Sequence, residues 1–308
     1  AYKTYTENQL FSPEISTTTG YSKLYVNAGK VTNKGIELAL GFKQNIGPVD
    51  WKTTLLWSLN RNRIDQLLPE YTNEELGVTV HLDEMDVYSL GGAKQRLTVG
   101  GSMGDVYVNT MRTDEHGHIW MNSMTGTLET DKNNYVYAGN TNPKYTLSWR
   151  NEFNWKGISL GFMLNARVGG IGVSATQAVM DYYGVSKTSA EARDNGGVKV
   201  NGQMIDAQTW YQTIGANGTG YVGSMYVYSM TNVRLGELTL GYDIPINKWG
   251  KWISGLNVSF VGRNLWMLYC KAPFDPESTA STGTYNQGMD YFMQPSLRSM
   301  GFSAKISF

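Results

Sequence analysis

The sequence predicts an all-β fold, a transmembrane antiparallel β-barrel, and three observations carry this prediction. Apolar and polar residues alternate along most regular segments, short turns alternate with long polar segments, and charged residues are few while aromatic residues and glycines are many. Strict alternation places one apolar and one polar face on a strand. A strand that crosses a bilayer needs only about 9–11 residues, half of them facing lipid. No window approaches the roughly 20 consecutive apolar residues of a membrane-spanning helix.

The composition argues against several classes of protein. Charged residues make up 17% of the 308 residues, against about 25% in soluble domains. Aromatic residues reach 12% and glycines number 35, and this mixture argues against an ordinary cytosolic enzyme. The formal net charge is zero, so no overall field attracts nucleic acid. The single Cys270 permits no internal disulfide bond.

The strands are expected where the alternation is clearest. In the first of them, Ile36, Leu38 and Leu40 lie on one face, with Glu37 and Lys43 opposite. The same pattern recurs along the chain and, allowing for weaker segments, gives about ten strands. The clearest segments are 35–43, 50–60, 144–155, 158–168, 233–245, 256–264 and 299–308.

The strand predicted over 233–245 departs from the pattern. Its apolar parity changes near Gly236, which predicts a bulge or the end of the lipid-facing zone.

The connections between strands are of two kinds, as in outer-membrane barrels. Short turns are expected over 45–50, over 154–157 and near Pro245, and long polar segments over 69–97, 171–225 and 269–297, with a short helix around 174–184. Four tryptophans stand beside the short turns, where an interfacial aromatic girdle would place them. They are Trp51, Trp155, Trp249 and Trp252.

The faces opposite the apolar ones carry charge. A soluble sandwich also alternates, but there the second face of each strand would not collect Arg, Glu, Lys and Asn. We therefore expect lipid on the apolar face and water, or another part of the protein, on the polar face. A secreted β adhesin or glycan-binding module is a further alternative to a membrane barrel. The lumen-facing candidates are Arg150, Glu152, Arg167 and Arg263.

Five local patterns imitate catalytic or ligand sites. "GGSMG" around Ser102 has the spacing of a nucleophile elbow, but a β pattern follows where a helix is required. "TDEHGHIW" brings His116 and His118 beside two carboxylates and is interpreted as a hairpin tip with no metal. "GIGVSA" lacks the βαβ unit of a dinucleotide site. "DEMD" and "FDPE" could offer oxygens to calcium, and exposed acidic loops are the favoured interpretation.

Several motifs together resemble the SusC/RagA-type TonB-dependent transporters. They are, in family order, "NAGKVTNKGIEL", "NTNPKYTLSWRNEFNWKGISLGFML", "VRLGELTLGYDIP", "VGRNLW", "FDPE" and the terminal "GFSAKISF". The resemblance implies that residues 1–308 are the C-terminal part of a barrel of about 22 strands. The family's plug domain and TonB box are expected to be absent from this chain.

The resemblance also implies a function and partners. The whole protein would lie in the outer membrane of a Gram-negative bacterium and import oligosaccharides or peptides. A SusD-like surface lipoprotein would cover it, the TonB complex would energise it through the missing N-terminal part, and the barrel-assembly machinery would recognise Phe308. No catalysis and no cofactor are expected, with calcium in the extracellular loops left open. The alternative is a self-contained passive barrel of about ten strands.

The long segments carry the candidates for substrate or partner contact. Aromatic rings offer a rigid stacking surface to sugars and peptides, or else they pack the segments on one another. The candidates are Tyr88, Trp120, Tyr182, Tyr183, Trp210, Tyr211 and Tyr285.

Overall fold

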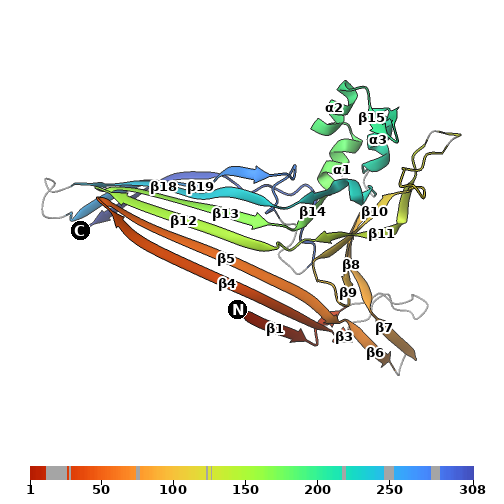
Figure 1. The fold of residues 1–308 in the computed structure, drawn as a ribbon, viewed down its shortest axis with the longest axis horizontal. Coiled ribbons are helices and arrows are strands. Elements are labelled where there is room, and N and C mark those ends of the chain that lie inside the picture. The colour runs from red at the N-terminus through yellow and green to blue at the C-terminus, as the bar shows by residue number, and fades with distance from the viewer. Residues whose placement is uncertain are drawn as a thin grey trace.

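The main feature of the fold is an eight-stranded antiparallel sheet whose long strands run along most of the molecule (Figure 1). The computed structural model describes residues 1–11, 26–27, 29–73, 77–122, 124–125, 127–216, 220–245, 253–278 and 285–308. In spatial order the strands are β1 (Tyr2–Glu7), β4 (Lys30–Ile46), β5 (Val49–Gln66), β12 (Tyr145–Trp155), β13 (Ile158–Val168), β18 (Asn232–Ile244), β19 (Gly255–Cys270) and β21 (Ser299–Ser307). Every segment predicted from alternation lies in one of these strands, to within one residue at its ends.

The sheet is open. Its edge strands β1 and β21 each have one neighbour among the described residues, and the two do not pair with each other. Eight strands, where about ten were expected, therefore form a section of a barrel wall.

The register builds one continuous apolar face. Directly opposed residues of an antiparallel pair lie on the same side of a sheet. The apolar face passes through the pairs Leu38–Trp57, Trp57–Leu147, Leu160–Leu240, Leu240–Phe260 and Phe260–Phe302. Nothing in the described chain covers this face, and the side chain of Phe302 is 84% exposed. An uncovered apolar surface of this extent is what a barrel presents to lipid.

The predicted change of parity at Gly236 is confirmed as a bulge. The register shifts between Met163 and Leu164 on one side of β18, and between Leu235 and Glu237 on that strand itself. As a result, Leu235 and Leu238 both face the apolar side. A β carbon at position 236 would collide with the Asn165 side chain, so glycine fits there.

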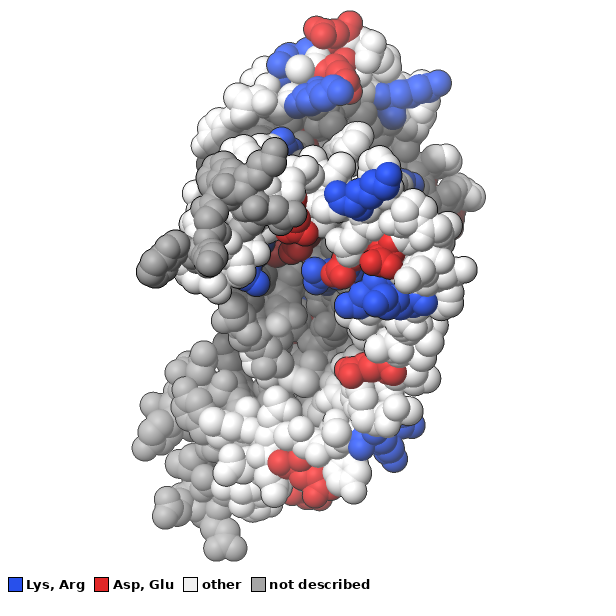
Figure 2. All heavy atoms as spheres, turned by 90° about the vertical axis from the view of Figure 1, so that its left-hand side faces the viewer, with Lys and Arg blue, Asp and Glu red and all other residues white. Residues whose placement is uncertain are grey.

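The short turns gather at one end of the sheet, called here the short-turn end. Figure 2 views the molecule from this end and shows acidic and basic side chains mixed around a central recess. Trp51 and Trp155 lie at this end, as predicted, whereas Trp249 and Trp252 fall outside the described residues.

Aromatic rings and hydrogen bonds combine near the short-turn end of the apolar face. The rings of Trp51 and Phe153 stack with centroids 6.2 Å apart. The Trp51 indole donates to Asn151 Oδ1 at 3.1 Å, and the Trp149 indole donates to Thr53 Oγ1 at 2.9 Å. Both acceptors lie on the apolar face, so the indoles satisfy polar atoms that lipid could not.

The opposite, or loop, end has much more regular structure than the single short helix expected within its long polar segments. Its strands are β2 (Leu10–Phe11), β3 (Val26–Asn27), β6 (Leu68–Asn73), β7 (Val78–Leu82), β8 (Glu84–Leu90), β9 (Ala93–Thr98), β10 (Asp105–Met111), β11 (Thr130–Asn140), β14 (Ile171–Ser174), β15 (Val198–Val200), β16 (Gln203–Ile205), β17 (Val227–Ser229) and β20 (Met289–Asp290). Its helices are α1 (Ala175–Tyr182), α2 (Lys187–Asp194), α3 (Ala207–Ile214) and the 3₁₀ turn Gly223–Tyr226. The expected helix around 174–184 is α1, capped by Ser174.

The buried core of the protein lies at the loop end. One cluster joins β9, β10, β14, α1 and α3 through residues such as Val106, Val173 and Ile214. A smaller one joins the ends of β4 and β5 to β9 through Val31, Ile64, Leu67, Leu68 and Leu97. None of the described helices is long and apolar enough to cross a bilayer.

The two faces can be distinguished by neighbouring substitutions in β4. Leu38 lies on the apolar face and Ala39 on the polar face, and both are exposed. In the full-length protein, Leu38→Arg should lower the free energy of unfolding by about 2–4 kcal/mol, because a charge then enters hydrocarbon. Ala39→Arg should lower the free energy of unfolding much less. Unfolding titrations in lipid bilayers measure both variants. Equal losses would contradict this assignment of the faces.

Candidate functional site

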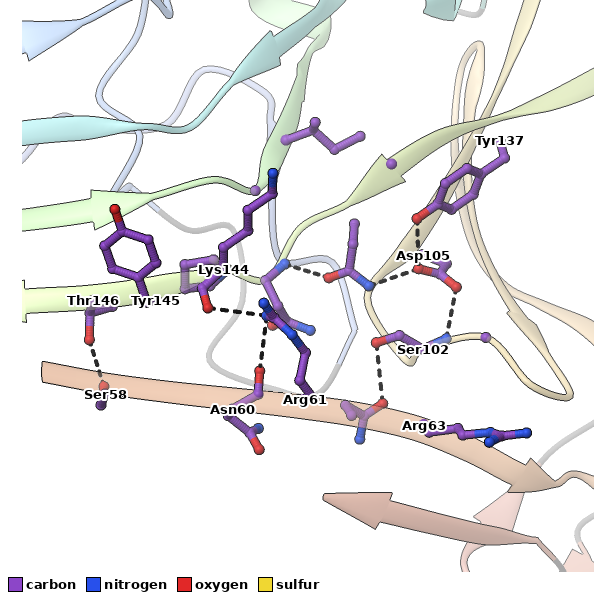
Figure 3. Close-up of a pocket in the computed structure, with 18 of the residues that line it drawn as sticks. Ser58, Asn60, Arg61, Arg63, Ser102, Asp105, Tyr137, Lys144, Tyr145 and Thr146 are labelled. Atoms are coloured by element: carbon purple, nitrogen blue, oxygen red, sulfur yellow. Dashed lines mark hydrogen bonds between the residues drawn. The ribbon is translucent and has the colours of Figure 1, made fainter. Parts of the chain in front are cut away.

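A cavity of about 830 Å³ opens at the loop end, between β5 and β12 (Figure 3). The two strands pair only as far as Ser58 and Thr146, beyond which β5 continues to Gln66 paired with β4 but not with β12. The far wall comes from the turn before β10 and from the link between β11 and β12. The lining includes Asn60, Arg61, Asn62, Arg63, Ser102, Asp105, Tyr137, Asn140, Asn142, Lys144 and Tyr145.

A buried carboxylate organises one side of this cavity. Asp105 accepts hydrogen bonds from Asn140 Nδ2 at 2.7 Å, from the Ser102 backbone N–H at 2.7 Å and from the Tyr137 hydroxyl at 3.4 Å. Burial, and then the charge of Asp105, raise the pKa of Tyr137. Because these bonds fix Asp105 in place, the groups left for a ligand are amides, tyrosines and cations.

The cations lie across the cavity from Asp105. Arg61 Nη1 donates to the Lys144 carbonyl at 3.1 Å, which links the diverging strands (Figure 3). Arg63 and Lys144 also line this cavity. Such a lining suits a ligand with hydroxyl, amide or carboxylate groups.

The nucleophile-elbow imitation lies in this lining and is not a hydrolase site. Ser102 stands in a turn between β9 and β10, two strands, and its hydroxyl donates to Asn62 Oδ1 at 3.3 Å. No histidine is among the residues that line the cavity.

The predicted lumen-facing charges lie on the polar face and contact mainly protein. Arg150 and Glu152 form an ion pair of 2.8 Å, which Lys52 joins at 3.7 Å and Glu237 at 4.0 Å. Farther along this face, Arg167 Nη2 donates to the Thr141 carbonyl at 2.7 Å, and Arg263 lies opposite Glu237 in the register. Three of the four candidates therefore have protein partners in this chain.

Most of the aromatic candidates pack within the chain. Trp210 is only 8% exposed and belongs to the larger core, which favours the alternative that it packs the segment on itself. Tyr88 and Tyr211 pack against the same core, and Tyr285 packs against the smaller one. Trp120 lies under the guanidinium of Arg112, 4.7 Å from ring to cation.

One candidate pair remains accessible, and the sequence analysis missed a second. Tyr182 and Tyr183 meet edge to face at 5.2 Å at the end of α1, and Tyr183 is 64% exposed. Near the start of α1, Tyr291 and Phe292 meet at 5.1 Å, with Phe292 59% exposed and its backbone N–H bonded to Thr176 Oγ1 at 2.6 Å. The signal in the sequence is two adjacent aromatic residues in a segment already recognised as long.

Three of the motifs quoted for the family resemblance meet in one buried ion cluster. Arg234 of β18 donates to Asp275 Oδ1 at 2.8 Å and to Asn264 Oδ1 at 3.1 Å, and it lies 3.3 Å from Glu277. Asp275 also accepts from Ser296. Burial favours a raised pKa for Asp275, but hydrogen bonds from Ser296, Glu277 N–H and Arg234 outweigh it and lower the pKa to about 2. The cluster anchors residues 275–277 and Ser296 to the sheet.

The remaining acidic patterns are satisfied within the chain. Asp114 accepts from the backbone N–H groups of His116 and His118 at 2.9 and 2.8 Å, which forms the predicted hairpin tip. Of the "DEMD" stretch, Asp86 bonds Arg96 at 2.6 Å and Lys94 at 3.0 Å. Within the described ranges, no three histidine, cysteine or acidic side chains gather in a metal-ligating group.

Comparison with known proteins places the chain beside TonB-dependent receptors. No family model matches it. TonB-dependent receptor P3 of Formosa agariphila is 23% identical over 100% of this chain and 32% of its own length, and receptor P26 of the same organism is 22% identical over 98% and 32%. The chain thus spans about a third of these relatives.

Solved structures agree. The RagAB peptide transporter superposes with a TM-score of 0.66 at 16% identity, covering 97% of this chain and 32% of the other. The RagAB peptide importer in its open-open state superposes with a TM-score of 0.64 at 15% identity. This match covers 99% of this chain and 32% of the importer chain. These likenesses confirm the predicted resemblance, the all-β barrel fold and the outer-membrane location. The relatives are named receptors and transporters, in agreement with the expectation of no catalysis.

The ion cluster makes a prediction about pH and stability. The pKa of Asp275 is lowered by folding, so its contribution is complete above the ordinary value of 3.8 and is lost as pH falls toward about 2. Asp275→Asn should cost about 3 kcal/mol at neutral pH, because buried Arg234 loses its nearest carboxylate. It should also remove this part of the acid sensitivity.

The measurement is chemical unfolding of the full-length protein between pH 5 and pH 2, with exposed Asp194→Asn as the control. Equal stabilities for the two variants at every pH would contradict the role of the cluster.

Proposed function

We propose that the chain forms the C-terminal wall and part of the extracellular cap of a SusC-like outer-membrane transporter. The complete protein imports oligosaccharides or peptides together with a SusD-like surface lipoprotein and is energised by the TonB complex. The observation that carries the proposal is the open eight-stranded sheet with an uncovered apolar face, in a chain that aligns with about a third of TonB-dependent receptors. No cofactor takes part.

The polar face supplies the lining of the lumen in this proposal. Charges would be costly toward lipid, whereas in a lumen they meet water or a plug domain. The linked pairs of Arg150, Glu152 and Lys52 keep this wall polar and fixed in shape. Arg263, which forms no ion pair within the described residues, is the candidate for contact with a plug.

The loop end supplies the surface for substrate and lid. The 830 Å³ cavity offers amides, tyrosines and cations, which suit either a glycan or a peptide. The solved RagAB structures are named for peptides, which supports the peptide alternative. The exposed aromatic pairs beside α1 support contact with a partner protein, because interfaces are enriched in aromatic residues.

A self-contained passive barrel is the weaker candidate. A closed barrel needs its first and last strands to pair, and β1 and β21 occupy opposite edges of the described sheet.

The aromatic pairs give a test of the lid contact. In the full-length transporter, Tyr183→Ala combined with Phe292→Ala should lower the affinity for the lipoprotein about tenfold or more, because buried aromatic anchors dominate interface energies. Val185→Ala combined with Met204→Ala removes other exposed apolar side chains of the same end and is the control. Capture in pull-down and substrate uptake are measured. Wild-type capture and uptake in the aromatic variant would contradict the proposal.

The terminal residue gives a test of the assembly signal. Phe308 is exposed at the end of the edge strand β21, and no core contact explains its apolar side chain. Its deletion should reduce the outer-membrane level of the full-length protein several-fold, as quantified in membrane fractions, while Phe308→Tyr should not. An unchanged level after deletion would refute recognition of Phe308.

A further inference from the structure

The loop end of the apolar face carries a localised group of basic side chains on β1, β4 and β5. They surround a second cavity of about 530 Å³. The register sets Lys3 opposite Lys34 and Lys34 opposite Arg61, so the three lie in one row across the strands. The cations of this group, called here the basic cluster, are Lys3, Lys30, Lys34, Arg61 and Arg63.

The basic cluster begins where the apolar surface ends. Ile36 and Leu59 are opposite each other on the same face, and Lys34 and Arg61 follow two residues farther toward the loop end. At 3.3–3.4 Å per residue, this row of charge lies about 7 Å beyond the last apolar row. That is the depth at which hydrocarbon gives way to lipid headgroups.

The cluster has an excess of positive charge. Glu7 pairs with Lys30 at 2.7 Å, and Asp65 lies 3.8 Å from Arg63. Five cations against these two carboxylates leave three positive charges. Within the described residues, Lys3, Lys34 and Arg61 form no ion pair.

The charge is also confined to one place. On the apolar face of β12, β13, β18, β19 and β21 the described residues include no charged side chain, and their loop ends carry residues such as Tyr145, Val168 and Trp266. At the short-turn end of β4 and β5 the same face carries Ile46, Val49 and Trp51. The cluster is therefore specific to one leaflet and to one sector of the wall.

We propose that the basic cluster binds the phosphate groups of an anionic glycolipid headgroup in the leaflet on the loop side. The occupant is a lipid because the cluster continues the lipid-facing surface, where a soluble partner would have to displace the bilayer. Arg61 and Arg63 supply planar guanidinium groups that bind phosphate in two-point fashion, and the lysines supply point charges. The cavity between them receives the headgroup.

The test uses the full-length transporter in vesicles of phosphatidylethanolamine with phosphorylated lipid A, and in matched vesicles with dephosphorylated lipid A. Lys34→Gln combined with Arg61→Gln removes two charges of the cluster. Lys43→Gln combined with Lys305→Gln removes two charges from the polar face and is the control. Native mass spectrometry measures retained lipid A, and inorganic phosphate alone is added to separate samples.

The wild type and the control should retain phosphorylated lipid A selectively. The cluster variant should lose about fivefold in affinity for each cation removed, since a juxtamembrane cation contributes about 1 kcal/mol. Equal retention by the cluster variant and the control, or equal retention of dephosphorylated lipid A, would overturn the proposal. So would displacement of lipid A by inorganic phosphate at equal concentration. If the double variant does not reach the membrane, Lys34→Gln alone is measured with the same criteria. Substrate uptake does not enter this test, so its outcome is separate from that of the proposed transport.

Discussion

Backbone hydrogen bonding governs this structure, because a strand surrounded by lipid has no water to satisfy its N–H and C=O groups. The long strands therefore pair residue by residue where their apolar face is exposed. At the loop end, where two neighbouring strands of the sheet separate, another part of the chain takes the place of the lost neighbour. Beyond Ser58, where β12 leaves β5, the Ile64 N–H bonds the Gly101 carbonyl at 2.8 Å, and the Gly100 N–H bonds the Ile64 carbonyl at 2.8 Å. The cavity between β5 and β12 is opened by this exchange of partners.

The loop end depends on the sheet through buried polar contacts as well as through its own core. Arg234, Asn264 and Asp275 come from β18, β19 and the following segment, yet they form one cluster. A buried ion pair of this kind is costly unless its groups are hydrogen-bonded. Here Ser296 donates to Asp275, whereas Arg234 Nε has no hydrogen-bond partner within the described residues. Three of the motifs that pointed to a transporter family are thus explained by architecture, because they fix the loop end to the wall.

The sequence predicted the wall far better than the loop end, for a physical reason. A strand with lipid on one side and water on the other must alternate apolar and polar residues. Even the bulge at Gly236 is visible in the sequence, as a change in the parity of the apolar residues. The elements of the loop end are short and bury residues without a single dominant period. Polar composition therefore made 69–97 and 171–225 look irregular. In the same way, α1 and α3 are too short for their patterns to show that Trp210 of α3 faces inward while Tyr183, directly after α1, faces outward.

The pairing of β5 with β12 joins segments that are far apart in the chain, and this has a kinetic consequence. The hydrogen bond from Trp51 to Asn151 spans 100 residues. Closing a long loop costs conformational entropy before any contact can offset that cost. Pairings between residues far apart in the sequence therefore slow folding. The intervening residues include β8 to β11, which pair with one another as a four-stranded sheet. Once that sheet has formed, the flexible chain between β5 and β12 is shorter, and the entropic cost of joining the two strands falls. The small sheet at the loop end is then a folding aid for the wall, because it turns one distant encounter into a series of local ones.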